Sequence, residues 1–189
     1  METLVGLLRG INVGSNNRIA MPDLRAALAD AGFENVRTYV QSGNIVLDTE
    51  LGDCALAEAI AGLIAARFGL DVPVVVRSAA ELAEVVAANP FPDAALTAPK
   101  LLQVTFLSSP LPDDAAERVR GTSTGVFSRD TEAISLAISR LNVYGWHPQG
   151  IHVSKLARDL SDRKLGVIAT ARNWTTVTTL LEMASTDVG

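Results

Sequence analysis

The sequence predicts an α+β protein in two parts. The first is a ferredoxin-like β-α-β-β-α-β unit over residues 1–77, and the second is an α+β unit with a small antiparallel sheet over residues 78–189. Strand-like and helix-like hydrophobic periods follow one another in that order along the first part. After Pro90 and Pro92, which mark a break, short alternating segments and amphipathic helices recur. One compact domain overall stays an open alternative.

The elements of the first part follow from the spacing of apolar residues. Residues 4–11 are a short apolar run that predicts a strand, and residues 12–17 are turn formers. Pro22 suits the first turn of a helix that Gly32 ends. The other predicted elements are a hairpin of strands at 36–40 and 45–47, a helix at 54–68 and a strand at 72–76.

The elements of the second part are shorter, and no internal repeat is evident in the sequence. Two final helices are expected to begin near Ser154 and Asn173, because both residue types cap helix N-termini, and the first should run towards Lys164. The remaining predictions are helices near 80–88 and 113–119, a strand at 101–107, a turn at 121–125, and three short sheet segments at 126–128, 133–138 and 141–144.

Composition excludes several classes of protein. With 48% hydrophobic and 20% charged residues, the chain can bury a core and is not predicted to be disordered. The net charge of −5 argues against general nucleic-acid binding. No apolar run is long enough for a membrane helix, and Glu2 stands where an export signal has positive charge, so a cytoplasmic protein is expected.

Few residues suit metal or catalytic chemistry. Cys54 is the only cysteine, so no internal disulfide and no cysteine-based zinc site can form. His147 and His152 lack a metal-helix spacing, and no Gly-x-Ser-x-Gly motif marks a hydrolase nucleophile. The sequence therefore predicts no metal, no cofactor and no identifiable catalytic residue.

Basic residues gather near the end of the chain. Residues 140–180 hold six bases and two acids, a local charge of +4. A solvated helix face with i,i+4 ion pairs explains such a pattern in most proteins. Two bases nevertheless stand at predicted helix starts: Lys155 follows Ser154, and Arg172 precedes Asn173. Helix N-termini favour anions, so these positions predict an anion receptor.

Two further polar clusters lie in the first part of the chain. One follows the first strand and includes Arg9, Asn12 and Arg18; the other is the hairpin turn with Ser42 and Asn44. Turn formation explains most of these residues. Loops held between rigid elements also bind ligands, which is the alternative. The glycine spacing matches neither a P-loop nor a dinucleotide fingerprint.

Three groups of residues carry a resemblance to a known family. They are LLRGINVG at 7–14, VRTYVQSGNIV at 36–46, and SKL at 154–156 followed by LGVIATARNWTTV at 165–177. Over essentially its whole length the chain resembles the bacterial domain-of-unknown-function family 1697. The resemblance implies an α+β fold with a ferredoxin-like portion and no agreed substrate. Residues 144–153 depart from the family's pattern at Trp146, His147 and His152.

The leading hypothesis is a site for a small phosphorylated or carboxylated ligand, such as a nucleotide, where the two parts meet. Three alternatives stay open: a protein-interaction or structural module that self-associates, a single-stranded nucleic-acid binder that uses Tyr39, and an enzyme that acts on the bound anion. The predicted ligand-binding residues are Arg9, Asn12, Arg18, Ser42, Asn44, Lys155, Arg172 and Asn173.

Overall fold

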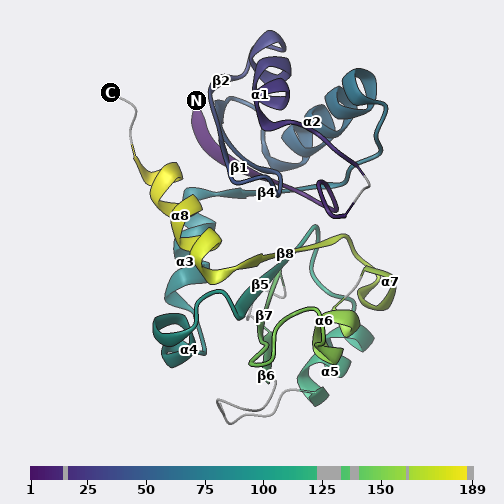
Figure 1. The fold of residues 1–189 in the computed structure, drawn as a ribbon, viewed down its shortest axis with the longest axis vertical. Helices are drawn as coiled ribbons and strands as arrows, with labels where there is room; N and C mark the ends of the chain where they lie inside the picture. Colours follow the sequence, from purple (N-terminus) through teal and green to yellow (C-terminus); the bar gives the residue numbers. More distant parts are fainter. Residues whose placement is uncertain (15–16, 123–132, 137–140, 161, 187–189) are drawn as a thin grey trace. The chain divides into compact units, whose positions relative to one another are not determined.

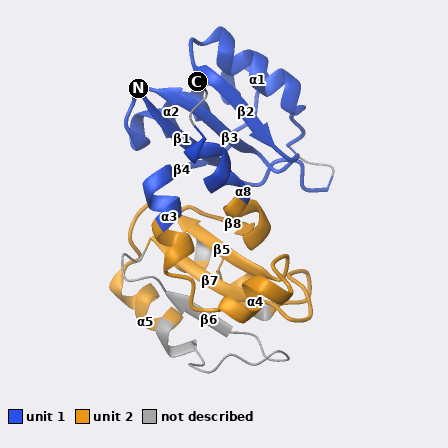
Figure 2. Ribbon diagram, turned by 90° about the vertical axis from the view of Figure 1, so that its left-hand side faces the viewer, with its two compact units in different colours: residues 1–83, 179–189 blue, residues 84–178 orange. Residues whose placement is uncertain are grey.

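The computed structural model describes residues 1–14, 17–122, 133–136, 141–160 and 162–186. The chain divides into two compact units, which Figure 2 colours separately. Unit 1 comprises Met1–Ala83 and Thr179–Gly189, and unit 2 comprises Glu84–Thr178. The boundaries between the units fall inside two helices, α3 (Ala79–Ala87) and α8 (Trp174–Ser185). The sequence instead predicts one division, after residue 77, which assigns the C-terminal residues to the second part.

Unit 1 has the element order that the sequence predicts. Its strands form an antiparallel sheet in the order β2-β3-β1-β4, so β1 is a central strand that pairs with both β3 and β4. The predicted α+β class, with its N-terminal β-α-β-β-α-β order, is confirmed. The elements are β1 (Glu2–Leu8), α1 (Met21–Asp30), β2 (Glu34–Tyr39), β3 (Asn44–Thr49), α2 (Asp53–Phe68) and β4 (Val74–Ser78).

Both α1 and α2 pack on one face of this sheet (Figure 1). Alternate residues of a strand point to the same face, so Leu4 and Leu8 of β1 face the helices and join one buried core with Leu24 of α1 and Ile60 of α2. Gly69 ends α2 in the left-handed conformation, with φ of 67°, as a C-terminal glycine does. The hydrophobic spacing therefore fixed these helices in the predicted places.

The opposite face of the first sheet carries two arginines. Strand register places Arg77, Val5, Val46 and Arg37 in one row across the four strands. Burial lowers the pKa of Arg77, and the negative charges of Glu81 and Asp53 oppose that effect. At the other end of the row, Nη1 of Arg37 donates to the carbonyl of Met183 in α8, at 2.9 Å. This face is therefore packed as well.

Unit 2 repeats the topology of unit 1. It holds β5 (Leu102–Leu107), α5 (Asp113–Thr122), β6 (Ala133–Leu136), β7 (Asn142–Trp146), α6 (Lys155–Asp159), α7 (Asp162–Leu165) and β8 (Ala169–Asn173), preceded by α4 (Pro92–Thr97). Its sheet order is β6-β7-β5-β8, which is the order of unit 1 with each strand replaced by its counterpart. The predicted second α+β unit with a small antiparallel sheet is confirmed. The predicted turn at 121–125 lies largely, and the strand at 126–128 wholly, outside the described residues.

Three features of unit 2 differ from the sequence prediction. The single helix expected from Ser154 to Lys164 is two short helices, α6 and α7. The region around Pro90 and Pro92, expected as a break, contains the short helix α4. Strand β8 was not predicted at all, because its sequence ATARN has small and polar side chains where a strand pattern has large apolar ones.

Candidate functional site

Two asparagine side chains bond across the segment that follows β1: Nδ2 of Asn17 donates to the carbonyl of Gly10 at 3.3 Å, and Asn12 makes the other contacts. Nδ2 of Asn12 donates to the carbonyl of Ile19 at 2.9 Å, and Oδ1 of Asn12 accepts the backbone N–H of Ile19 at 3.0 Å. The backbone N–H of Asn12 bonds the carbonyl of Asn17 at 3.0 Å. Asn12 itself is left-handed, with φ of 53°, a conformation that asparagine tolerates better than most residues. Asn12 thus closes this segment into a defined loop.

The turn between β2 and β3 is held by a second asparagine. Asn44 is completely buried, and its Nδ2 bonds the carbonyl of Tyr39 and Oγ of Ser42, both at 3.1 Å. Gly43 lies against β1, because its carbonyl accepts the N–H of Leu8 at 2.8 Å. A Cβ atom on Gly43 would lie 2.6 Å from Cβ of Leu8. The turn therefore requires glycine at this position.

The loop and the turn contact each other. The same Nδ2 of Asn12 that bonds Ile19 also donates to the carbonyl of Gln41, at 2.7 Å. Gly43 also closely approaches Ile11 of the loop. Two clusters that are about thirty residues apart in the sequence therefore form one surface. We call it the loop–turn cluster, and define it as residues 9–14, 17–19 and 40–44.

The loop–turn cluster holds five of the predicted ligand-binding residues, which divide into two kinds. The side chains of Arg9, Arg18 and Ser42 are exposed and stand where a ligand can reach them. Asn12 and Asn44 use their amide groups within the cluster, and Oγ of the exposed Ser42 accepts one of these hydrogen bonds, from Asn44. The two asparagines therefore hold the backbone of the cluster, and ligand contact by any of the five residues stays a prediction.

Val40 is a strained residue that the sequence gives no reason to expect. Its φ is 48°, although β-branched residues rarely adopt the left-handed region, and the side chain is 52% exposed. Such strain costs on the order of 1–3 kcal/mol and gathers at functional sites. The sequence signals that mark left-handed positions are glycine and asparagine, so a left-handed valine can be found only from the three-dimensional structure.

Substitution of Val40 by asparagine should therefore stabilise the protein. We expect the free energy of unfolding to rise by about 1 kcal/mol, because asparagine tolerates this backbone conformation. Val13→Asn is the matched control, since Val13 is 69% exposed in the same cluster and does not have a positive φ. Urea denaturation of both variants measures the difference. Equal effects of the two substitutions would show that backbone strain at Val40 does not matter.

The other three predicted residues lie in unit 2. Ser154 caps α6 as predicted, since its Oγ accepts the N–H of Ala157 at 2.9 Å, and Lys155 is the first residue of that helix. Asn173 caps α8 as predicted, with Oδ1 accepting the N–H of Thr176 at 2.9 Å. The meeting of these residues with the loop–turn cluster stays a prediction.

Arg172 has a position equivalent to that of Arg77 in the other sheet. Each precedes a capping residue at the end of the last strand, and each donates from Nη1 to the preceding carbonyl, at 2.6 Å for Arg77 and 2.8 Å for Arg172. Arg172 is 7% exposed and also bonds Oγ1 of Thr170. Burial lowers its pKa to about 10, so the guanidinium is still charged at neutral pH. Its predicted ligand role stays a prediction.

His147, to which the sequence assigns no role, pairs with the capping serine of α6. Its Nδ1 lies 2.8 Å from Oγ of Ser154, and both residues are buried. A Cβ atom at position 145 would approach Nε2 of the same ring to 2.8 Å, which explains Gly145. This hydrogen bond joins the end of β7 to the start of α6.

Among the described residues, no group of His, Cys, Asp and Glu side chains could hold a metal ion, and no helix is long and apolar enough to span a bilayer.

The comparisons with known proteins agree with this fold. The chain is similar to a solved structure, conserved bacterial protein SP0830 from Streptococcus pneumoniae, with 20% sequence identity and a TM-score of 0.69 over 97% of this chain and 99% of the other. At that identity the likeness concerns the fold alone. No curated protein matches the chain.

A family model supplies the assignment. It matches residues 1–135, a range that includes all of the loop–turn cluster and the segments 7–14 and 36–46 that carry the resemblance. The segments at 154–156 and 165–177 lie beyond the matched range. Because the match covers well over half of the sequence, the chain belongs to the family described as "Protein of unknown function (DUF1697)".

Proposed function

We propose that the loop–turn cluster of unit 1 binds a small phosphorylated or carboxylated ligand, such as a nucleotide. The observation that carries the proposal is the side chain of Asn12: two of its hydrogen bonds, to Ile19, close the loop that bears Arg9 and Arg18, and the third, to the carbonyl of Gln41, joins that loop to the turn that bears Ser42. Arginine offers a planar set of donors that fits phosphate and carboxylate oxygens, and a serine hydroxyl adds a further donor.

The rigidity of the cluster supports the proposal. A binding loop that must be ordered by its ligand loses affinity, because the ordering cost is subtracted from the contact energy. Here the hydrogen bonds of Asn12 and Asn44 order the backbone before any ligand arrives. Gly10, Asn12, Gly14 and Asn17 are left-handed, so the backbone turns at each of these positions. The asparagines are therefore proposed as positioning residues, and the arginines as the ligand contacts.

Removal of the two arginines tests the proposal. The full chain would be screened by thermal shift against pyrophosphate, ADP, glucose 6-phosphate and citrate, since a ligand at 100 times its Kd stabilises by about 2.7 kcal/mol. We expect at least one compound to raise the Tm. The Kd of that compound should rise at least tenfold in the double variant Arg9→Gln, Arg18→Gln. The control variant Arg67→Gln, Lys100→Gln removes the same charge at two exposed positions outside the cluster.

Two outcomes would contradict the proposal. One is the absence of stabilisation by any of the four anions. The other is an equal loss of affinity in the cluster variant and the control variant, which would show that only net charge matters. The contribution predicted for Lys155, Arg172 and Asn173 has its own test. If these residues contribute to binding, Lys155→Gln should lower the affinity for the same ligand.

The protein-interaction alternative has one supporting observation. Val13 and Val40, 69% and 52% exposed, are apolar side chains on the same cluster, and exposed apolar residues mark contact surfaces when they gather. Sedimentation over a concentration series would detect self-association, and Val13→Asn should abolish it under this alternative.

Single-stranded nucleic-acid binding and a cytoplasmic location stay predictions from the sequence. RNA titration at two salt concentrations tests the nucleic-acid alternative.

A further inference from the structure

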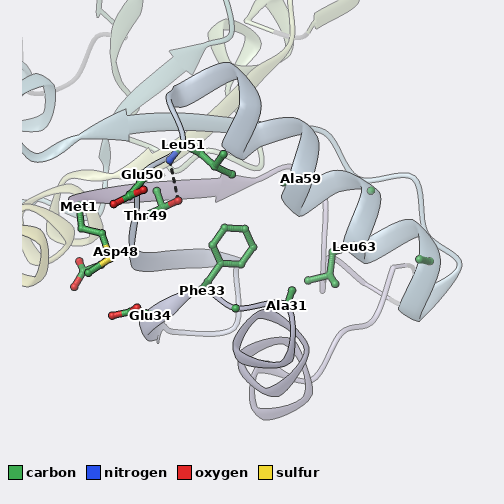
Figure 3. Close-up of a pocket in the computed structure, with 13 residues that line it drawn as sticks. Met1, Ala31, Phe33, Glu34, Asp48, Thr49, Glu50, Leu51, Ala59 and Leu63 are labelled. Atoms are coloured by element: carbon green, nitrogen blue, oxygen red, sulfur yellow. Dashed lines mark hydrogen bonds between the residues drawn. The ribbon is translucent and has the colours of Figure 1, made fainter.

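Unit 1 contains an open pocket that the proposed function does not use. It has a volume of about 780 Å³ and lies between the end of α1, the loop after β3 and one side of α2 (Figure 3). This is within the range of small-molecule sites. Its lining residues are Met1, Ala31, Gly32, Phe33, Glu34, Asp48, Thr49, Glu50, Leu51, Ala59, Gly62, Leu63 and Ala66.

One end of the pocket carries three carboxylates. Figure 3 shows Glu34, Asp48 and Glu50 on the same side of the Phe33 ring. Asp48 is fixed by two donors, since Oδ1 accepts the hydroxyl of Thr3 and Oδ2 accepts Nδ2 of Asn35, both at 2.6 Å. These hydrogen bonds lower the pKa of Asp48, so this carboxylate is ionised at neutral pH. Each of its oxygens can accept a further hydrogen bond.

The rest of the pocket is apolar. The ring of Phe33 stands near the middle, Leu51 lies above it and Leu63 lies on the α2 side (Figure 3). Along α2 the lining residues Ala59, Gly62 and Ala66 have small side chains or none, which leaves room beside the helix. An aromatic ring next to carboxylates also offers its negative face to a cation. The pocket therefore has an apolar end and a second end where the three carboxylates outnumber the one cation among the lining residues, the amino terminus of Met1, so that its net charge is negative.

We propose that this pocket binds an organic cation, with its ammonium or guanidinium group among Glu34, Asp48 and Glu50 and its apolar body against Phe33 and α2. The proposal is independent of the anion site, because it concerns other residues and a ligand of opposite charge. Charge complementarity selects the ligand class: an anion of the same shape would meet three carboxylates, and a small inorganic cation would gain nothing from the apolar end.

Three probes of one shape test the choice of ligand. The full chain would be titrated with 2-phenylethylammonium, 2-phenylethanol and 3-phenylpropanoate, and binding followed by calorimetry and by backbone amide shifts. We expect the ammonium to bind at least tenfold more tightly than the alcohol and the carboxylate not to bind, with amide shifts at Gly32, Thr49 and Gly62. Equal affinity for ammonium and alcohol, no binding of the ammonium, or amide shifts elsewhere would overturn the proposal.

Two variants test the site itself. The double variant Glu34→Gln, Glu50→Gln should lower the affinity for 2-phenylethylammonium at least tenfold. The control variant Glu58→Gln, Glu84→Gln should leave that affinity unchanged, because it removes two negative charges at exposed positions outside the pocket lining. Gly62→Leu should fill the pocket and abolish binding without lowering the Tm, because a Cβ atom there meets nothing within 4 Å and leucine favours helix. Undiminished binding to Gly62→Leu would place the ligand elsewhere and refute the inference.

Discussion

Replacement of Gly43 by alanine should lower the free energy of unfolding by about 3 kcal/mol. Two costs add at this position. The backbone φ of 73° is unfavourable for any residue with a Cβ atom, and that atom would lie 2.6 Å from Cβ of Leu8 and 2.7 Å from Cδ1 of Ile11. Cβ of Leu8 is fixed directly to the backbone of β1, so it cannot move aside without displacing the central strand.

Gly10→Ala separates the two costs. Gly10 has a similar φ of 68°, but a Cβ atom there would meet nothing within 4 Å. We expect this variant to lose only about 1 kcal/mol, which is the conformational cost alone. Thermal and urea denaturation of both variants provide the measurement. Equal losses would mean that the turn moves away from β1 at little cost, and would contradict the tight contact between the turn and β1.

Replacement of Asn12 by alanine should cost about 2–3 kcal/mol and should also abolish anion binding. The side chain makes three hydrogen bonds, each worth about 1 kcal/mol when partly exposed, and alanine is less tolerant of the φ of 53°. The binding effect follows because the loop would no longer hold Arg9 and Arg18 in place. Hydrogen exchange at the Ile19 amide, which Asn12 protects, reports directly on the loop.

Asn35→Ala is the matched control for Asn12. Asn35 is also left-handed, with φ of 50°, but it makes one exposed hydrogen bond, to Asp48. We expect a smaller loss of stability, about 1–2 kcal/mol, and no change in anion binding. An Asn12→Ala variant that keeps full anion affinity would show that anion binding does not depend on the order of this loop.

The fold of unit 1 could be predicted because its apolar residues keep a clear period. Leu24 and Leu28 mark one face of α1, and Gly69 ends α2 in the conformation that glycine favours. Unit 2 was harder to predict in detail. Strand β8 gains its place from pairing with the buried strand β5, through Val104 opposite Arg172, and not from its own side chains. Pairing of this kind is a tertiary effect that no local pattern reveals.

The repeat of one topology in the two units was missed for the same reason. Only a few positions are shared in kind: Arg77 and Arg172 end equivalent strands, and Ser78 and Asn173 then cap α3 and α8. A penultimate arginine followed by a polar cap is too short a pattern to be recognised in a sequence of 189 residues. Strand register reveals the equivalence, because Arg77 lies opposite Val5 of β1 in one sheet and Arg172 lies opposite Val104 of β5 in the other.

The candidate site was predicted in part. The turn formers around Asn12 and Ser42 identified two loops, but nothing local indicates that Asn12 reaches the carbonyl of Gln41. The sequence also suggested ligand contact for Asn12 and Asn44, whose amides bond within the cluster. Side chains of the same type bind ligands in one protein and close turns in another, and only hydrogen-bond partners separate the two roles.

The most direct test of the central claim is to map anion binding residue by residue. Pyrophosphate would be titrated into the full chain labelled with nitrogen-15 while the backbone amides are followed. The account predicts the largest shifts at Gly10, Gly14, Ser42 and Gly43, and their loss in the Arg9→Gln, Arg18→Gln variant. Binding that leaves the amides of residues 9–14, 17–19 and 40–44 unmoved, or no binding at all, would contradict it.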